Sequence, residues 1–340
     1  MTLNEVLAAP VWPAAPDALA TAQERLAWYP CVARLAPSKH NTQPWRFILH
    51  RGSLELWTDK NRALSATDPR MRELVISCGT ALHHLEVAAH ALGRELVVDV
   101  LPEGGSSLLA RIAEGPRRQV TARDEALLAA VGHRHTDRGP LDVSRLAPSL
   151  PFQMQSTASE HDAVLRLVVT AGDRATLGAL VARADRMLAR DGGLDAELAD
   201  WVRSPGDPGD DGVPADRTRG PAASYRAEFV QRDFSGGAGG AAHDRVGEDR
   251  PLVGILCTPE DRIADWLTAG RALSAVLLAA TVAGANASFL NQPIEVDSLR
   301  RELRTDLRIV GQPQLVLRMG AGGPVLPTPR RPIEQIRVEA

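Results

Sequence analysis

The sequence predicts an α+β protein made of two similar halves. Helical and strand-like segments occur in comparable supply in both parts of the chain, and two long apolar helices, one in each part, share a spacing of glycine and alanine. With 340 residues, 44% of them hydrophobic, the chain is long enough to fill two cores. We expect residues 1–118 to form the first half and residues 119–340 the second, each with an antiparallel-rich sheet.

The first half is expected to begin with a helix and a shaped loop. A helical pattern runs from about Ala18 to Tyr29 and is interrupted at Pro30. The segment 36–45, Ala-Pro-Ser-Lys-His-Asn-Thr-Gln-Pro-Trp, contains two prolines and small polar residues, so it is predicted to be a loop. Two short apolar strands separated by a hairpin turn follow, at 46–50 and 54–57 with the turn at 51–53.

The later elements again mix helices and strands. A long apolar helix from about Met71 to Gly93 ends at a glycine, and a shorter helical run extends from Glu125 to Val131. A second long helix is expected from about Asp261 to Gly284. Strands are expected at 95–101, 164–169, 252–257 and 314–318.

The two long helices repeat one pattern. Residues 78–93 align with residues 269–284, so that G-x-A-L, then A-A, then a closing glycine recur. Two alanine-rich helices can match by chance, and self-similarity indicates an architecture only when it is sustained. Here one period spans about half of the chain, which is compatible with a duplicated unit.

Residues 204–251 are rich in glycine, proline and aspartate, and this stretch is too long and too polar for a simple connector. Two interpretations stay open, a mobile surface excursion and an active-site lid. The embedded Tyr225 and Phe229 keep the lid interpretation open.

The bulk composition favours a small-molecule partner. A net charge of −3 provides no basic field for nucleic acid or for a membrane surface. The N-terminal residues lack the basic start and apolar run of a signal peptide, and no stretch reaches the roughly 18 apolar residues of a membrane span. Cys31, Cys78 and Cys257 form no CxxC pair, which indicates buried thiols and a reducing compartment. We therefore expect a soluble, cytoplasmic protein.

Three polar clusters contain the candidate site residues. His133 to Pro140 combines arginines with a hydroxyl, the chemistry of a phosphate cradle, although a solvated helix end with capping cations has the same composition. Prolines hold Arg330 and Arg331 in an extended arm that can close over the same phosphate. The turn 291–295 has backbone donors that can face a planar heteroaromatic ring.

Other common motifs are missing. The glycine-rich pieces at 236–240 and 320–323 do not lie between a strand and a helix, as a dinucleotide fingerprint requires. There is no GxxxxGK[ST] or GxSxG, and the histidines lack a HExxH pattern or a cysteine companion. We therefore expect no Rossmann domain and no metal site, and adjacent His83 and His84 are interpreted as helix-surface or core residues.

The segment 36–45 resembles the APSxxNxQPW signature of FMN-dependent nitroreductases. Residues 134–138 are similar to the family's R-[RH]-S-x-[RK] phosphate motif, 291–295 to its P-x-E flavin-facing turn, and 330–332 to its C-terminal arginine arm. In the family these motifs occur once per subunit, with the phosphate motif first, and each flavin lies between two subunits. Here the loop precedes the phosphate motif, and no clear second copy of either is present.

This order resembles the tandem branch called the Acg family, fused nitroreductase-like proteins with one flavin site and a lid. The resemblance implies a nitroreductase-like fold whose two halves form an intramolecular pseudo-dimer, so that the chain works as a monomer, with 204–251 as the lid. It also implies one FMN in a composite site. The implied FMN-binding residues are Pro37, Ser38, Lys39, Asn41, Arg134, His135, Thr136, Arg138, Gln292, Pro293, Glu295, Arg330 and Arg331.

The resemblance also implies roles for these residues. The arginines and Thr136 hold the phosphate and ribityl chain, while the loop 37–41 reaches the ring and offers Lys39 as a charge near N1. Pro293 and Glu295 face N5 and the pyrimidine edge.

The implied activity is that of an FMN-binding oxidoreductase that uses NAD(P)H to reduce a small nitroaromatic, quinone or similar acceptor by ping-pong hydride transfer. The flavin supplies the chemistry, so no side chain is assigned as catalytic. The alternative is a non-enzymatic protein that sequesters FMN beneath the lid, and lid mobility and nicotinamide access distinguish the two. A dehydrogenase acting on one metabolite would use the same site.

Overall fold

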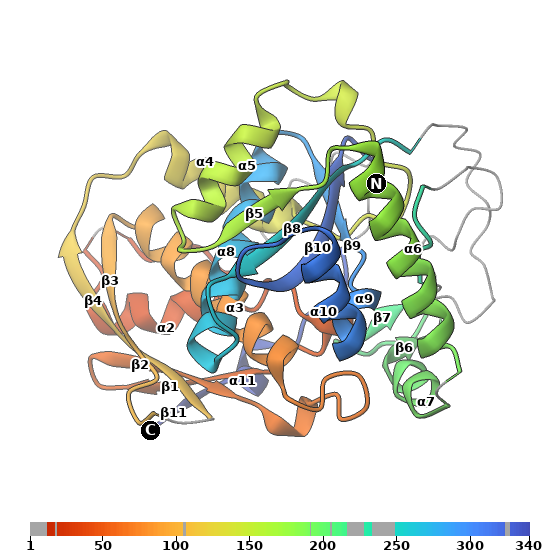
Figure 1. Cartoon of the computed structure of the whole chain (residues 1–340). Helices are drawn as coiled ribbons and strands as arrows, with labels where there is room; N and C mark the ends of the chain where they lie inside the picture. The colour runs from red at the N-terminus through yellow and green to blue at the C-terminus, as the bar shows by residue number, and fades with distance from the viewer. Residues whose placement is uncertain are drawn as a thin grey trace.

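The computed structural model describes residues 12–17, 19–104, 107–190, 192–204, 206–215, 228–232, 249–323 and 327–340. Mixed helices and sheets make an α+β fold, in which the central helices α3 and α8 run between two larger sheets (Figure 1). The helices are α2 (Ala22–Ala33), α3 (Arg72–Ala91), α4 (Ala122–His133), α5 (Leu150–Ser159), α6 (Ala171–Leu188), α7 (Gly192–Trp201), α8 (Ile263–Val282), α9 (Gln292–Glu295), α10 (Asp297–Asp306) and α11 (Ile333–Ile336), with 3₁₀ turns η1 (Lys39–Asn41), η2 (Lys60–Arg62) and η3 (Val143–Arg145).

The strands form two larger sheets and a short pair. The order is β11-β1-β2-β4-β3 in the first sheet and β5-β8-β10-β9 in the second, and all neighbours are antiparallel except β11, which runs parallel to β1. The strands are β1 (Trp45–His50), β2 (Ser53–Thr58), β3 (Arg94–Val100), β4 (Leu108–Arg117), β5 (Val164–Leu167), β6 (Val202–Arg203), β7 (Val213–Pro214), β8 (Leu252–Thr258), β9 (Asn286–Phe289), β10 (Gln312–Gly320) and β11 (Arg337–Glu339). The C-terminal strand therefore completes the sheet that contains the N-terminal strands.

The two helices that repeat one sequence pattern cross each other at their glycines. A Cβ atom added to Gly79 would lie 2.3 Å from the carbonyl oxygen of Leu267, and one added to Gly270 would lie 2.0 Å from that of Ile76. Gly79 and Gly270 are aligned in the repeat, and so are Ile76 and Leu267. The contact is thus reciprocal, and only glycine permits backbones to approach this closely.

The helix α2 differs from the expected element because it continues through Pro30. Arg34 N donates to the carbonyl of Pro30 at 3.0 Å, so the helical bonding extends beyond the proline. A proline inside a helix removes one backbone donor, but Cys31, Val32 and Ala33 are buried in the core. Burial of this last turn offsets the lost hydrogen bond. The predicted interruption at Pro30 was wrong.

The other predicted elements are present with boundaries shifted by a few residues. Gly93 (φ +68°) and Gly284 (φ +78°) follow the two long helices in the left-handed conformation, as their predicted role as glycine stops requires. Gly52 (φ +83°) lies in the hairpin between β1 and β2. The segment 291–295, predicted as a turn, contains the short helix α9. The other helices and strands that were not predicted are β4, β6, β7, β9, β11, α5, α6, α7, α10 and α11.

The helix α8 is the single described helix long and apolar enough to cross a membrane. Of its most apolar stretch, 67% is buried inside the protein, mainly against α3, which is typical of a core helix. Cys31, Cys78 and Cys257 are buried free thiols, as predicted.

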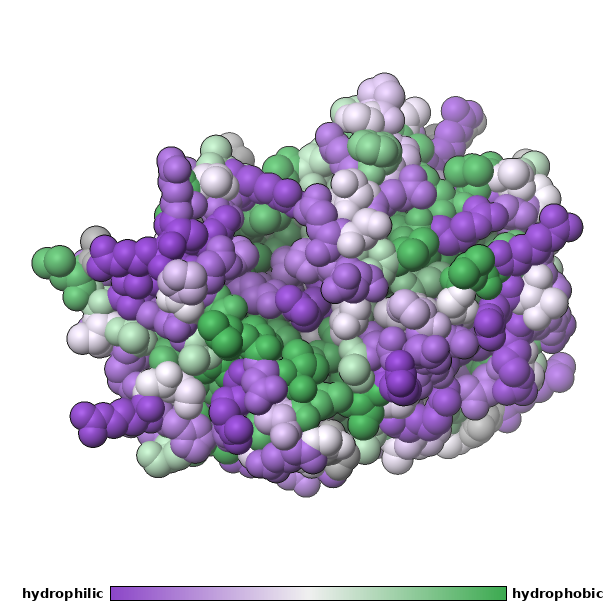
Figure 2. Space-filling view, turned by 60° about the vertical axis from the view of Figure 1, so that its left-hand side comes forward, coloured by the Kyte–Doolittle hydropathy of each residue, from purple (hydrophilic) through white to green (hydrophobic). Residues whose placement is uncertain are grey.

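One face of the molecule has apolar side chains gathered in a central strip between charged and polar ones (Figure 2). Among the exposed apolar residues, Val97 and Val100 lie on β3, at the edge of the first sheet. Charged residues on the same strand, such as Arg94 and Asp99, discourage pairing of an exposed edge with another chain.

Candidate functional site

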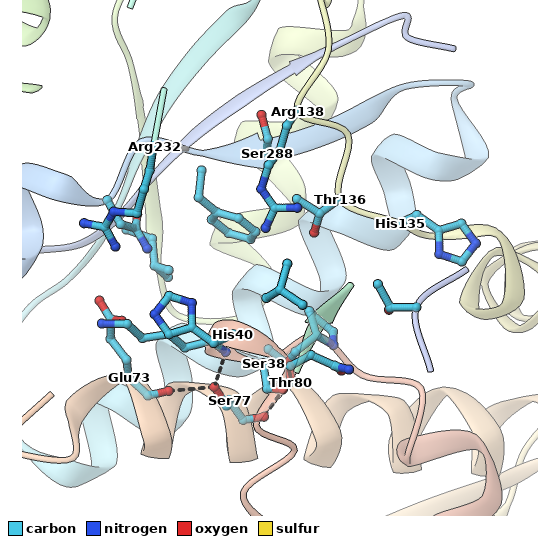
Figure 3. Close-up of a pocket in the computed structure, with 18 of the residues that line it drawn as sticks. Ser38, His40, Glu73, Ser77, Thr80, His135, Thr136, Arg138, Arg232 and Ser288 are labelled. Atoms are coloured by element: carbon cyan, nitrogen blue, oxygen red, sulfur yellow. Dashed lines mark hydrogen bonds and ion pairs between the residues drawn. The ribbon is translucent and has the colours of Figure 1, made fainter. Parts of the chain in front are cut away.

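A large pocket lies where the loop 37–41, helix α3, residues 134–138, strand β9 and the C-terminal arm meet. In Figure 3, Glu73, Ser77 and Thr80 face the pocket from α3, while Arg138, Thr136 and Ser288 face it from the opposite side. The predicted site residues that line it are Pro37, Ser38, Lys39, Asn41, Arg134, His135, Thr136, Arg138, Gln292, Glu295 and Arg330. The structure thus gathers most of the predicted residues in one place.

Two predicted residues do not line this pocket. Arg331 turns away from it, donating from Nη1 to the carbonyl of Gln43 at 3.1 Å and from Nη2 to that of Gln335 at 3.1 Å. Neighbours in an extended arm point to opposite sides, so Arg330 and Arg331 cannot face the same pocket. Pro293 is buried within the short helix α9, next to residues that do line the pocket.

The loop is held in its shape by α3. Thr80 Oγ1 donates to the carbonyl of Pro37 at 2.7 Å, and Lys39 N donates to Ser77 Oγ at 3.3 Å. Three loop residues have left-handed backbone conformations, namely His40 (φ 49°), Asn41 (φ 56°) and Gln43 (φ 49°). Such conformations cost energy in non-glycine residues and persist only where the surroundings impose them.

One end of the pocket has an excess of buried positive charge. Arg134, at the C-terminal end of α4, is buried, and burial lowers its pKa to about 10. Its Nε makes no hydrogen bond within the described residues, and neither does Nε of Arg330. Burial, followed by the positive charges of Arg134 and Arg34, lowers the pKa of Arg330 to about 9. Buried guanidinium groups without a carboxylate are costly, so this end is built to receive an anion.

The opposite end contains a balanced network of buried charges. Lys39 Nζ lies 2.7 Å from Glu73 Oε2 and 3.3 Å from Glu295 Oε1, and Arg232 Nη2 lies 2.6 Å from Glu295 Oε2. Burial would raise the pKa of Glu295, but Arg232 and Lys39 overcome this and hold it at about 2. Lys39 therefore lies between two carboxylates that it shares, since Glu73 also pairs with Arg72 at 2.8 Å and Glu295 with Arg232.

Polar and apolar groups share the middle of the pocket. Burial lowers the pKa of Arg138 to about 10, against a smaller opposing effect of Asp137. Ser288 Oγ on β9 is buried and makes no hydrogen bond within the described residues. Apolar surface comes from Ile76, Leu273 and Phe289. The pocket can therefore receive a ligand with an anionic end, a polar middle and a flat apolar part.

Parts of the segment 204–251 cover the pocket. Gly212, Val213 and Pro214 line it, as do Gln231 and Arg232. Phe229 is buried against α6, with the Arg174 guanidinium 5.5 Å from its ring centre. Tyr225 lies outside the described residues. The described parts of this segment thus occupy the place expected of a lid.

Several pocket residues were not predicted from the sequence. Glu73, Ser77 and Thr80 lie at helical spacing on α3, a polar stripe that could have indicated a site. Ser288 was missed because β9 was not recognised as a strand. Arg232 lies in a stretch whose composition gives no signal for structure.

Comparisons with known proteins identify relatives that align with most of the chain. No protein-family model matches the chain. Three Mycobacterium tuberculosis proteins each align with 90% of it: "Putative NAD(P)H nitroreductase Rv3131" at 34% identity over 88% of its own length, "Putative NAD(P)H nitroreductase acg" at 32% over 92%, and "Uncharacterized protein Rv3127" at 31% over 90%.

The α+β fold encloses a pocket that has positive charge at one end, a kind of cavity typical of proteins that bind small molecules. Identity above 30% over nine tenths of both chains shows the family. The chain belongs to the nitroreductase family that includes these mycobacterial proteins, and its general role is that of an oxidoreductase.

Proposed function

We propose that the pocket binds FMN and that the protein is an NAD(P)H-dependent oxidoreductase. The observation that supports this most directly is the pair of Arg134, which is buried, and Arg330, which is half-buried with a buried Nε; both have lowered pKa values. A phosphate with about two negative charges would neutralise both. Relatives named as NAD(P)H nitroreductases support the same proposal.

The rest of the pocket fits the remainder of FMN. The hydroxyls of Thr136 and Ser288 are available to a polyhydroxyl chain, and Ile76, Leu273 and Phe289 offer apolar surface to a planar ring. Bound FMN supplies hydride chemistry, taken from NAD(P)H and passed in a ping-pong sequence to a nitroaromatic, quinone or similar acceptor. The protein itself binds and orients the flavin and excludes water from the pocket.

The charge near the pyrimidine edge of the ring is assigned to Arg138 in this proposal. Lys39 lies between Glu73 and Glu295, so its charge is paired within the protein. Arg138 lines the pocket, with a pKa lowered to about 10 by burial. A fixed positive charge there would favour the reduced, anionic ring.

We also propose that the two halves form an intramolecular pseudo-dimer and that the chain is a monomer. The reciprocal glycine contact between α3 and α8 supports this, because a two-fold interface makes residue i touch j and residue j touch i. The pair His83 and Ser274, 191 residues apart and aligned in the repeat, face each other at 2.8 Å.

A second candidate function is storage of FMN without turnover. The contacts of the segment 204–251 favour it, since Asn41 Nδ2 donates to the carbonyl of Gly212 at 3.0 Å and Arg232 pairs with Glu295. A lid held closed would keep nicotinamide from the ring.

An anaerobic absorbance titration near 450 nm tests both candidates. If bound flavin bleaches within seconds on addition of NADPH or NADH, the protein is an oxidoreductase and acceptors can be screened. If dithionite bleaches the flavin and neither nicotinamide does, storage is favoured. If the protein neither contains nor takes up FMN, the proposal is wrong.

A further inference from the structure

Asn41 joins three separate segments of the chain through one amide. Its Nδ2 donates to the carbonyl of Gly212, in the segment 206–215, and to that of Pro329, in the C-terminal arm, both at 3.0 Å. Its Oδ1 accepts from Arg330 Nη1 at 2.9 Å. The side chain is buried, and both its donor hydrogens and its oxygen are used inside the protein.

Gln43 repeats this arrangement two residues later. Its Nε2 donates to the carbonyl of Asp210 at 2.9 Å, and its Oε1 accepts from Arg331 N at 2.8 Å. Both Asn41 and Gln43 have positive φ values. Since this conformation is unfavourable in residues other than glycine, other contacts must sustain it. The two amides thus attach the same covering segment and the same arm to one loop.

We propose that Asn41 and Gln43 form a clasp that couples docking of the segment 206–215 to the position of Arg330. Asn41 is then a positioning residue for the anion-binding end of the pocket. The inference rests on the proposed function only for the identity of the anion, the phosphate of FMN. An anion that fixes Arg330 stabilises the docked segment, and by thermodynamic linkage the docked segment retains the anion.

Hydrogen exchange of the full chain, followed by mass spectrometry with and without FMN, tests the clasp. In the wild type, FMN should slow exchange in both 206–215 and 327–332. In Asn41→Ala the protection of 206–215 by FMN should fall about tenfold, and FMN should dissociate about tenfold faster, as expected when the three hydrogen bonds of this side chain are lost and water replaces part of them.

Arg62→Ala is the matched control. Arg62 holds the same segment through Asp211 and also donates from Nε to the carbonyl of Thr42 in the loop. Within the described residues it does not line the pocket and makes no hydrogen bond or ion pair with the arm. This variant should speed exchange of 206–215 equally with and without FMN. The ratio of the exchange rate without FMN to the rate with FMN should therefore stay at the wild-type value. Asn41→Gly, which adds no charge and permits the left-handed backbone of this position, removes the same hydrogen bonds and replaces Asn41→Ala if that variant is too unstable to measure.

Unchanged protection of 206–215 by FMN in the Asn41 variants overturns the clasp. If the wild type binds no FMN, the proposed function is wrong, and the clasp is then tested by hydrogen exchange measured without ligand. Asn41→Ala must then speed exchange of 206–215 and 327–332 together, and faster exchange in one segment alone overturns it.

Discussion

At the scale of single residues, the surroundings of a buried arginine distinguish a structural role from a binding role. Arg318 lies 3.0 Å from Asp249, and both side chains are fully buried. Arg134 is also buried, but its side chain makes no hydrogen bond or ion pair with a described residue, and burial alone lowers its pKa. Arg318 is therefore paired within the fold, whereas we propose that Arg134 binds an anion.

Arg134→Gln and Arg318→Gln should therefore act on different quantities. Arg318→Gln leaves Asp249 buried without its partner and should lower the free energy of unfolding by about 3 to 5 kcal/mol. Arg134→Gln should change it by less than about 1 kcal/mol and weaken FMN binding about 10- to 100-fold. Urea denaturation without ligand and a fluorescence titration with FMN measure the two effects. Equal destabilisation by both variants would refute the distinction.

His83 should make the protein less stable in acid. Burial lowers its pKa well below 6.5, and the nearby His161, His84 and Arg271 lower it further. An unfolded histidine takes up a proton near pH 6.5 and the folded one does not, so stability is lost as pH falls below that value. Between pH 7.5 and pH 5.5, the free energy of unfolding of His83→Gln, measured by urea denaturation, should fall by about 1.4 kcal/mol less than that of the wild type. Equal losses would show that His83 titrates normally.

At the scale of elements, local patterns predicted the long helices and the central strands. Strands such as β9 and β11 were missed because they are short and owe their conformation to pairing with strands far away in sequence. In the candidate site, too, some residues are indicated by the local sequence and others only by the tertiary structure. The loop 37–41 and the arginines of 134–138 stand out locally, but the polar stripe of α3 becomes a site only when the loop folds over it.

The crossing of α3 and α8 should tolerate no side chain at its two glycines. Gly79→Ala or Gly270→Ala should lower the free energy of unfolding by about 1 to 3 kcal/mol or more, because the new methyl group would overlap a backbone carbonyl. Gly172→Ala, near the start of α6, is the control, since its Cβ would meet nothing closer than 4.0 Å. It should be neutral or stabilising by about 0.4 to 1 kcal/mol. Similar effects at all three glycines would argue against the close crossing.

At the scale of the whole molecule, the pocket depends on segments from both ends of the chain. The loop 37–41 comes from the first part, 134–138 and β9 from the second, and Arg330 from the arm that continues into β11. That strand pairs with β1, directly after the loop. The pocket is therefore complete only when segments from both parts of the chain are brought together.

The most direct test of the central claim compares binding of FMN with binding of riboflavin, which lacks the phosphate. We predict that the wild type binds FMN about 100-fold more tightly or more, since two charge-assisted contacts are at stake, and that Arg134→Gln loses most of this preference. Equal affinity for the two flavins, or a full preference for FMN in Arg134→Gln, would contradict the assignment of Arg134 and Arg330 to the phosphate.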